Sequence, residues 1–325
     1  MNYEAKAAAY ARMSAIAKLM AVVLVAASST RFLSAQDLAP RAYVITPVHA
    51  NALTVSYSYS SGDIMFGSTL PLTGASGDTN LSILSYYHAM GVLGRSANVT
   101  VSLPYAVSTF QGELTGGTRS TRRSGLMDLT LRFSVNLKGA PAMNPEEFRA
   151  WRQKTIIGAS LKVLAPTGQY DPTKLINPGS NRWAFKPELG LSKRWGHWLL
   201  DGYGAVWLFT TNHDYFSRNR FNAGTNTQTQ SPVGAIEAHL SYDVRPRLWA
   251  SVDVNYWYGG RTALNGVASR PTLQANSRIG GTCSIPLNKR QSLKFSYSRG
   301  ARVRFGGNAH NASVAWQYSW LGRPR

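Results

Sequence analysis

Between residues 53 and 320, apolar and polar side chains alternate in stretches of about ten residues that are separated by polar breaks. The stretch 312–320, ASVAWQYSW, is typical, since every second residue is large and apolar: Val314, Trp316, Tyr318 and Trp320. A side-chain period of two is that of a β-strand, in which neighbouring side chains point to opposite faces. Repeated over most of the chain, it indicates strands with one face in an apolar medium and the other in water.

The composition limits where such strands can reside. Of the 325 residues, 44% are hydrophobic and the mean hydropathy is -0.20. No segment reaches the roughly 18 uncharged apolar residues that a membrane-spanning helix needs. Sixteen Tyr and nine Trp suit a boundary between apolar medium and water. The single cysteine, Cys283, cannot form an internal disulfide, so disulfides do not stabilise the fold. A closed barrel in a bilayer, in which every backbone group is paired between strands, can supply the stability instead.

The N-terminal region has the features of an export signal. Three basic residues precede an apolar run over residues 19–27, and a small-residue site follows at residues 33–35. This pattern predicts a signal peptide over residues 1–35, with a buried helix as the alternative. Residues 36–52 are then a periplasmic N-terminal segment, which is too short to fold as a plug domain.

Strand-like segments can be counted along the remaining chain. They lie near residues 53–60, 81–89, 97–107, 127–138, 154–165, 183–194, 198–210, 233–243, 247–258, 271–285, 291–298 and 312–320. Faces can be assigned in most of them. The residues expected to meet lipid include Leu129, Leu131, Phe133, Val135, Leu137, Ile236, Ala238, Leu240 and Tyr242. Residues 198–210 are apolar on both faces, and the pattern there does not decide which face is outward.

The connections differ in length in a regular way. Long ones at 61–80, 108–126, 166–182, 211–231, 259–270 and 299–311 alternate with short ones at 90–96, 195–197, 244–246 and 286–290. Bacterial outer-membrane barrels have long external loops and short periplasmic turns, whereas a soluble sandwich has no reason to alternate them. The sequence therefore predicts an all-β fold, an antiparallel transmembrane β-barrel of about 12 strands over residues 53–320, with a C-terminal tail at 321–325.

One predicted periplasmic connection, residues 139–153, is long. It contains Asn-Pro-Glu-Glu at residues 144–147, where Asn can cap a helix, Pro suits its first turn and the acids lie near its positive end. We expect a short periplasmic helix over residues 146–152. A plain loop is the alternative.

The middle of the chain resembles a known family. Residues 165–192, APTGQYDPTKLINPGSNRWAFKPELGLS, are similar to the MetA-pathway of phenol degradation family. So are residues 125–133, GLMDLTLRF, although the family more often has Gly at the position of Met127. The resemblance covers roughly 70 residues closely and the rest only in architecture. It implies an outer-membrane barrel, encoded near genes for the degradation of aromatic compounds.

The longer block of this resemblance, residues 165–192, also makes sense as a loop. Prolines and glycines keep it out of the sheet and permit tight reversals. The candidate loop and constriction residues are Pro166, Thr167, Gly168, Tyr170, Asp171, Asn181, Arg182 and Trp183. The last five of these could hold the loop inward across the mouth of the barrel. Such a loop either forms a constriction that selects solutes or serves barrel stability, and both interpretations remain open.

The predicted lumen contains charges of both signs. Its candidate lining residues are Asp128, Arg132, Lys162, Lys186, Glu188, Glu237, His239, Asp253 and Lys294. Lys186 and Glu188 fall on the lumenal side of their strand, where we expect an ion pair across the lumen. The net charge of +20 falls mostly in the predicted external loops, and no nucleic-acid-binding signature accompanies it. A basic rim can bind lipopolysaccharide phosphates or attract anionic solutes such as aromatic acids.

Catalytic signatures are scarce. The six His residues have no metal-ligand spacing, and no phosphate-binding glycine loop is present. We predict no catalytic residue and no cofactor; the leading hypothesis is a channel for passive passage of small solutes, such as aromatic compounds or aromatic acids. A closed structural or surface barrel without transport is the alternative, followed by a barrel hydrolase that would use Glu237 and His239.

The expected partners are outer-membrane lipid and lipopolysaccharide, small-molecule solutes and the barrel insertion machinery, with no nucleic acid. The insertion machinery usually recognises an aromatic residue at the C-terminal end of barrels of this class. Here the alternation stops at Trp320, and Leu-Gly-Arg-Pro-Arg follows.

Overall fold

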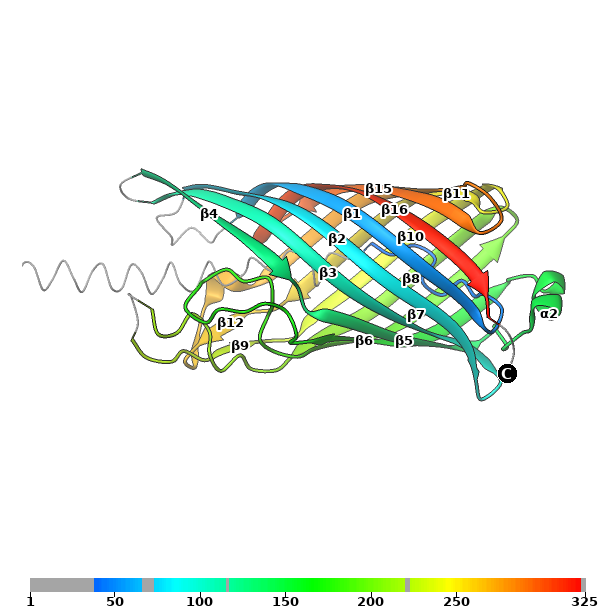
Figure 1. The fold of residues 1–325 in the computed structure, drawn as a ribbon, viewed down its shortest axis with the longest axis horizontal. Coiled ribbons are helices and arrows are strands. Elements are labelled where there is room, and N and C mark those ends of the chain that lie inside the picture. The colour runs from blue at the N-terminus through cyan, green and yellow to red at the C-terminus, as the bar shows by residue number, and fades with distance from the viewer. Residues whose placement is uncertain (1–37, 66–72, 115–116, 220–222, 323–325) are drawn as a thin grey trace, which may run out of the picture.

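The computed structural model describes residues 38–65, 73–114, 117–219 and 223–322. The predicted signal peptide and most of the predicted C-terminal tail lie outside these residues. Within them, antiparallel strands pair in a closed ring of 12, as the sequence predicted (Figure 1). The ring closes where the first strand pairs with the last, from Ala50 opposite Leu321 to Met65 opposite Gly306.

Six of the barrel strands are longer than the periodic pattern indicated, and the others are as long as predicted or slightly shorter. The barrel strands are β1 (Ala50–Met65), β2 (Thr73–Val92), β3 (Arg95–Leu114), β4 (Gly117–Leu126), β5 (Leu129–Lys138), β6 (Thr155–Ala165), β7 (Ala184–Trp195), β8 (Trp198–Phe209), β10 (Val233–Arg245), β11 (Leu248–Gly259), β14 (Gln274–Pro286), β15 (Gln291–Arg302) and β16 (Gly306–Leu321). Both β4 and β5 pair with β3, so together they form one interrupted strand of the ring.

Three of the predicted long loops were wrong in extent. Much of residues 61–80, 108–126 and 299–311 continues the flanking strands as external hairpins. These parts are polar on both faces because both faces meet water there. The alternation that reveals a strand is therefore lost, while backbone pairing continues unchanged.

The two ends of the barrel carry different small elements. One end has a three-stranded sheet of β9 (Gln228–Gln230), β12 (Thr262–Leu264) and β13 (Val267–Ala268), followed by the 3-10 helix η1 (Arg270–Thr272). The other end has the short turns and the helix α2 (Pro145–Ala150), which Figure 1 shows at the end of the barrel where β16 finishes. Short turns mark the periplasmic end of such barrels. No helix among the described residues is long and apolar enough to cross a membrane.

The predicted periplasmic helix is present as α2. The Asn144 side chain accepts hydrogen bonds from the backbone N–H groups of Glu146 and Glu147, both at 2.9 Å. The Glu147 carboxylate in turn accepts from the backbone N–H of Asn144 at 2.9 Å. This reciprocal capping box, with Pro145 in the first turn, explains why so short a segment forms a helix.

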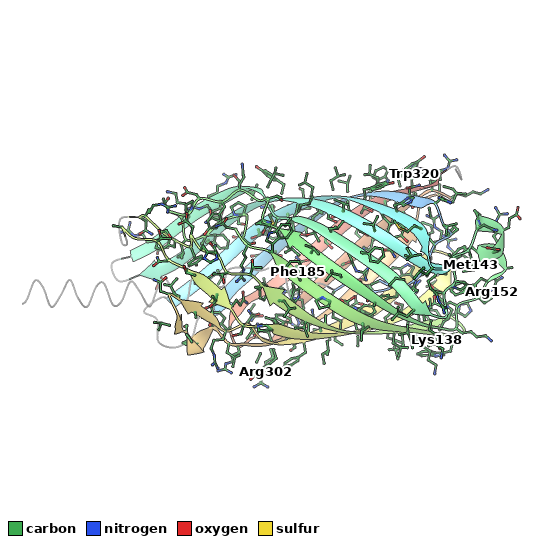
Figure 2. All side chains as sticks on the ribbon, turned by 90° about the horizontal axis from the view of Figure 1, so that it is seen from below. Lys138, Met143, Arg152, Phe185, Arg302 and Trp320 are labelled. Carbon is green, nitrogen blue, oxygen red and sulfur yellow. The ribbon has the colours of Figure 1, made fainter. Side chains whose placement is uncertain are left out.

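The outward face of the ring is apolar. Leu131, Phe133 and Leu137 of β5 are exposed while Ser134 and Asn136 between them are buried, so the predicted faces are confirmed. In β8, which the pattern left undecided, Leu199, Asp201, Tyr203 and Trp207 point inward. Figure 2 shows Trp320 at the periplasmic end of the barrel and Arg302 projecting outward in the external half. This is the surface expected of an outer-membrane barrel.

The N-terminal segment lies elsewhere than expected. The sequence predicted a periplasmic segment over residues 36–52, but its described part, residues 38–49, runs inside the lumen. Leu38 lies beside the inward-facing Gly280 of β14, and the Thr46 hydroxyl is 2.9 Å from the Tyr87 hydroxyl on β2. The segment therefore crosses the periplasmic part of the barrel before β1 begins.

Candidate functional site

The lumen has two unlike walls. Inward positions of β1, β2, β3, β15 and β16 carry small hydroxyl side chains, among them Thr54, Ser56, Ser85, Ser102, Ser108, Ser296 and Ser313. The opposite wall, from β5 to β14, carries large and charged side chains that pack against one another. We call these the hydroxyl wall and the charged wall. A solute can occupy only the part of the lumen that side chains do not fill. The small side chains of the hydroxyl wall leave such space beside them.

The charged wall is held by buried ion pairs. The Lys186 ammonium lies 2.9 Å from a carboxylate oxygen of Glu188 and 2.9 Å from one of Glu237. Arg132 lies 3.5 Å from Glu188. Lys186 therefore pairs with Glu188 of its own strand and with Glu237 of β10, along one wall of the lumen. These strongly desolvated pairs connect inward-facing side chains of β5, β7 and β10.

His239 belongs to the same wall. Its Nδ1 lies 2.9 Å from Asp253 Oδ1, and its Nε2 lies 3.7 Å from Glu237 Oε2. The Thr282 hydroxyl donates to the other Asp253 oxygen at 2.7 Å. A hydrolase would need an accessible nucleophile near Nε2, whereas the His239 side chain is 0% exposed. The arrangement therefore gives the hydrolase alternative no support.

The described residues contain no group of three or more His, Cys, Asp or Glu side chains that could hold a metal ion.

A glycine slot holds Tyr43 of the N-terminal segment against the charged wall. Gly158 of β6 and Gly190 of β7 face each other in register. A Cβ atom on Gly158 would lie 2.3 Å from the Tyr43 ring, and one on Gly190 would lie 2.0 Å from it. The Tyr43 hydroxyl donates to Glu188 at 3.0 Å. Burial, reinforced by Glu188, raises the pKa of Tyr43 to about 12, so the hydroxyl keeps its proton and donates.

Arg41 provides the second anchor of this segment. Its guanidinium lies 2.7 Å from Asp243 and stacks 4.2 Å from the centre of the Trp249 ring. Its backbone N–H donates to Asp201 at 3.0 Å. The sequence analysis missed this role because a short irregular segment has no periodicity. The available signal was the pair of inward-facing glycines, which leave a gap that some other residue must fill.

Asp128 holds the external loop of residues 166–183. Its two carboxylate oxygens accept the backbone N–H groups of Gly168 at 3.1 Å and Ser180 at 2.9 Å. Between these bonds the backbones of Gly168 and Gly179 touch, since a Cβ on Gly168 would lie 2.6 Å from the Gly179 Cα. The predicted lumen residue Asp128 therefore fastens both ends of the loop to the β4–β5 interruption.

Three other predicted loop residues join this loop to its neighbour at residues 211–231. Tyr170 donates to the Asp214 carbonyl at 3.0 Å, and Asn181 donates to Asn212 at 3.0 Å. Arg182 is buried, lies 4.4 Å from the centre of the Phe209 ring and donates to Gln230. The two loops thus form one layer over the charged wall.

The remaining predicted loop residues do not meet at the mouth. Trp183 is 45% exposed on the outward face and stacks on Phe185, so it does not hold the loop inward. Asp171 is exposed and accepts hydrogen bonds from Thr173 within its own turn. Thr167, which follows Pro166, accepts the Leu129 N–H at 3.0 Å and ties the loop base to β5.

Replacing Asp128 should destabilise the loop and the barrel together. Asp128→Ala leaves two part-buried N–H groups without an acceptor, which we expect to cost at least about 2 kcal/mol. Asp128→Asn keeps one acceptor and should cost less. Stability is measured as the temperature above which the purified protein no longer migrates as a folded barrel on SDS gels. Asp171→Ala, in the same loop but exposed, is the control, and an equal loss for both alanine variants would contradict the role of Asp128.

A cavity of about 380 Å³ lies under the loop, beside the hydroxyl wall. Its apolar lining includes Phe110, Ile176, Trp207 and Phe209, and its charged lining is Arg123, Asp128 and Lys162. The Trp207 side chain is buried, and its Nε1 finds no hydrogen-bond partner among the described residues. Such a volume lies at the lower end of the range of small-molecule sites.

Comparison with known proteins agrees with this architecture. The family described as MetA-pathway of phenol degradation matches residues 58–314. The chain belongs to this family. The match covers β2 to β15 and about half of β1 and of β16, so the resemblance seen in the loop of residues 166–183 extends over nearly the whole MetA-pathway barrel.

Solved structures with low sequence identity share the fold. An outer membrane channel from Pseudomonas putida F1 is 19% identical, with a TM-score of 0.71 over 87% of this chain and 100% of its own. The β domain of the Bordetella autotransporter BrkA is 11% identical, with a TM-score of 0.50 over 83% of this chain and 100% of its own. No curated protein matches the chain. The fold of this MetA-pathway protein is thus that of bacterial outer-membrane barrels.

Proposed function

We propose that the protein is an outer-membrane channel through which small solutes pass without energy input. The observation that carries the proposal is the cavity between the hydroxyl wall and the external loop. Apart from the residues of β5 to β8 that line this cavity, the charged wall is packed, so the cavity marks where a solute has room. Its mixed lining suits compounds that join an aromatic ring to a polar group. Membership of the MetA-pathway family, and the Pseudomonas channel of similar fold, support this function.

Reconstitution tests the proposal. In planar bilayers we expect discrete conductance steps, and in liposomes we expect entry of phenol and benzoate. Ala106, a buried residue of the cavity wall, supplies a blocking variant, since Ala106→Trp fills the cavity. Ala238→Trp, on the lipid-facing side of β10, is the matched control. Absence of conductance and of solute entry in the wild type would overturn the channel.

A closed structural barrel is the second candidate, because the N-terminal segment fills the periplasmic part of the lumen. It predicts no conductance even after that segment is removed. No catalytic role is proposed.

Two partners follow from the surface. Arg299 and Arg302, exposed at the external end of β15, can bind lipopolysaccharide phosphates. The outward aromatic face of β16 is suited to the insertion machinery.

A further inference from the structure

Two neighbouring periplasmic turns carry four exposed cations. The turn between β10 and β11 contributes Arg245 and Arg247, and the turn between β14 and β15 contributes Lys289 and Arg290. The two turns lie side by side because β11 pairs with β14. The Arg247 guanidinium joins them, since it donates to the backbone carbonyl of Asn288 at 2.6 Å. We call these four side chains the turn cations.

The turn cations have no carboxylate partner among the described residues. Neither turn contains an acidic residue, and none of the four cations takes part in an ion pair of the described part of the chain. The acid that precedes the first turn, Asp243, is already shared by Arg41, at 2.7 Å, and Arg194. The two turns therefore expose a block of positive charge at one side of the periplasmic rim.

Apolar side chains are exposed directly beside the turn cations. Val244, which precedes the first turn, is 60% exposed, and Leu287 in the second turn is 51% exposed. On β16, next to β15, Tyr318 and Trp320 stack with their ring centres 5.8 Å apart, and Figure 2 shows Trp320 at this end of the barrel. Such aromatic residues mark the level of the lipid headgroups. The turn cations thus lie where the hydrocarbon of the inner leaflet meets its phosphate groups.

The other cations at this end are differently placed. The long connection that contains α2 carries Arg149 and Arg152, but it also carries Glu146 and Glu147, so its charges balance. A block of cations without acids, bordered by exposed apolar side chains, is typical of a surface that recognises anionic lipid.

We propose that the turn cations bind an anionic phospholipid of the inner leaflet through the phosphate diester of its headgroup. Arg245 and Lys289 make no side-chain hydrogen bond or ion pair with any described residue, so both can pair with phosphate oxygens. Val244 and Leu287 contact the first carbons of the acyl chains. A headgroup with a net negative charge is preferred to a zwitterionic one, because the cation of the latter is repelled by the turn cations. The site is separate from the lumen and does not depend on the channel function.

Two phospholipids with identical acyl chains test the charge of the headgroup. Phosphatidylglycerol is anionic, and phosphatidylcholine is zwitterionic. The purified full-length protein in detergent is mixed with equal amounts of both, and native mass spectrometry counts the bound molecules of each. We expect bound phosphatidylglycerol to exceed phosphatidylcholine about tenfold.

A pair of double variants locates the preference. Arg245→Gln combined with Lys289→Gln should lower the tenfold ratio to about two, and each single variant should give an intermediate ratio. Arg149→Gln combined with Arg152→Gln removes the same charge from the α2 connection at the same end and should keep the wild-type ratio. Migration as a folded barrel on unheated SDS gels shows that a lower ratio does not come from unfolding.

The remaining outcomes separate a lipid from soluble anions of the periplasm. Glycerophosphoglycerol has the headgroup of phosphatidylglycerol without the acyl chains. If it displaced phosphatidylglycerol at equal concentration, the turn cations would bind soluble anions, and the assignment to a lipid would be overturned. Equal binding of the two lipids by the wild type, or an equal loss of preference in both double variants, would also overturn the proposal.

Discussion

Displacing Tyr43 from its glycine slot is expected to raise the single-channel conductance several-fold. In Gly190→Ala the new methyl group lies 2.0 Å from the ring, and the backbone of β7 cannot retreat because β6 and β8 hold it on both sides. The ring must therefore leave, together with its hydrogen bond to Glu188. Deletion of residues 38–47 should have a larger effect, because it also removes Arg41. Planar-bilayer recording measures both.

Gly204→Ala is the control for this experiment. Gly204 lies on the lipid-facing side of β8, and a Cβ there meets nothing within 4 Å. It should conduct as the wild type does. Tyr43→Phe keeps the ring in the slot without the hydroxyl and should give an intermediate result. If both Gly190→Ala and the deletion retained wild-type conductance, the N-terminal segment would not be the constriction of this pore.

The barrel itself could be predicted because its two environments differ so sharply. Lipid on one side and water on the other impose a strict alternation, and the faces of β5 and β10 follow from it directly. The external parts of β1, β3 and β15 escaped prediction because water on both faces removes the alternation. In β8 the pattern also failed, since Leu199 and Trp207 pack inside the lumen against other apolar groups.

The site was less predictable than the barrel. The alternation predicts that Asp128 faces the lumen. Its hydrogen bonds from the Gly168 and Ser180 N–H groups could not be predicted, because these residues lie 40 and 52 positions away along the chain. The position of Tyr43 depends on a fit between one ring and two glycines of neighbouring strands. Contacts of this kind leave no local pattern in the sequence, whereas the charged residues of the lumen do.

Removing the central cation of the charged wall should give the largest loss of stability. Lys186→Met leaves the carboxylates of Glu188 and Glu237 facing each other in a nearly dry wall, since all three side chains are under 10% exposed. Loss of one partner of such a buried pair costs about 3–5 kcal/mol. The loss of stability is measured on the protein in micelles, as the fraction that stays folded over a series of urea concentrations. Mobility on unheated SDS gels distinguishes folded from unfolded protein. Lys154→Met, at an exposed lysine just before β6, should change the stability by less than about 0.5 kcal/mol.

A compensating variant separates charge from packing in this prediction. If uncompensated carboxylates cause the loss, Lys186→Met combined with Glu188→Gln and Glu237→Gln should recover most of it, because amides replace the charges at nearly the same size. Glu188→Gln keeps an acceptor for the Tyr43 hydroxyl, so the N-terminal segment should stay in place and the conductance should remain that of the wild type. If the triple variant were no more stable than Lys186→Met, the loss would come from the missing contacts of the lysine chain, and the ion pairs would not be what holds this wall together.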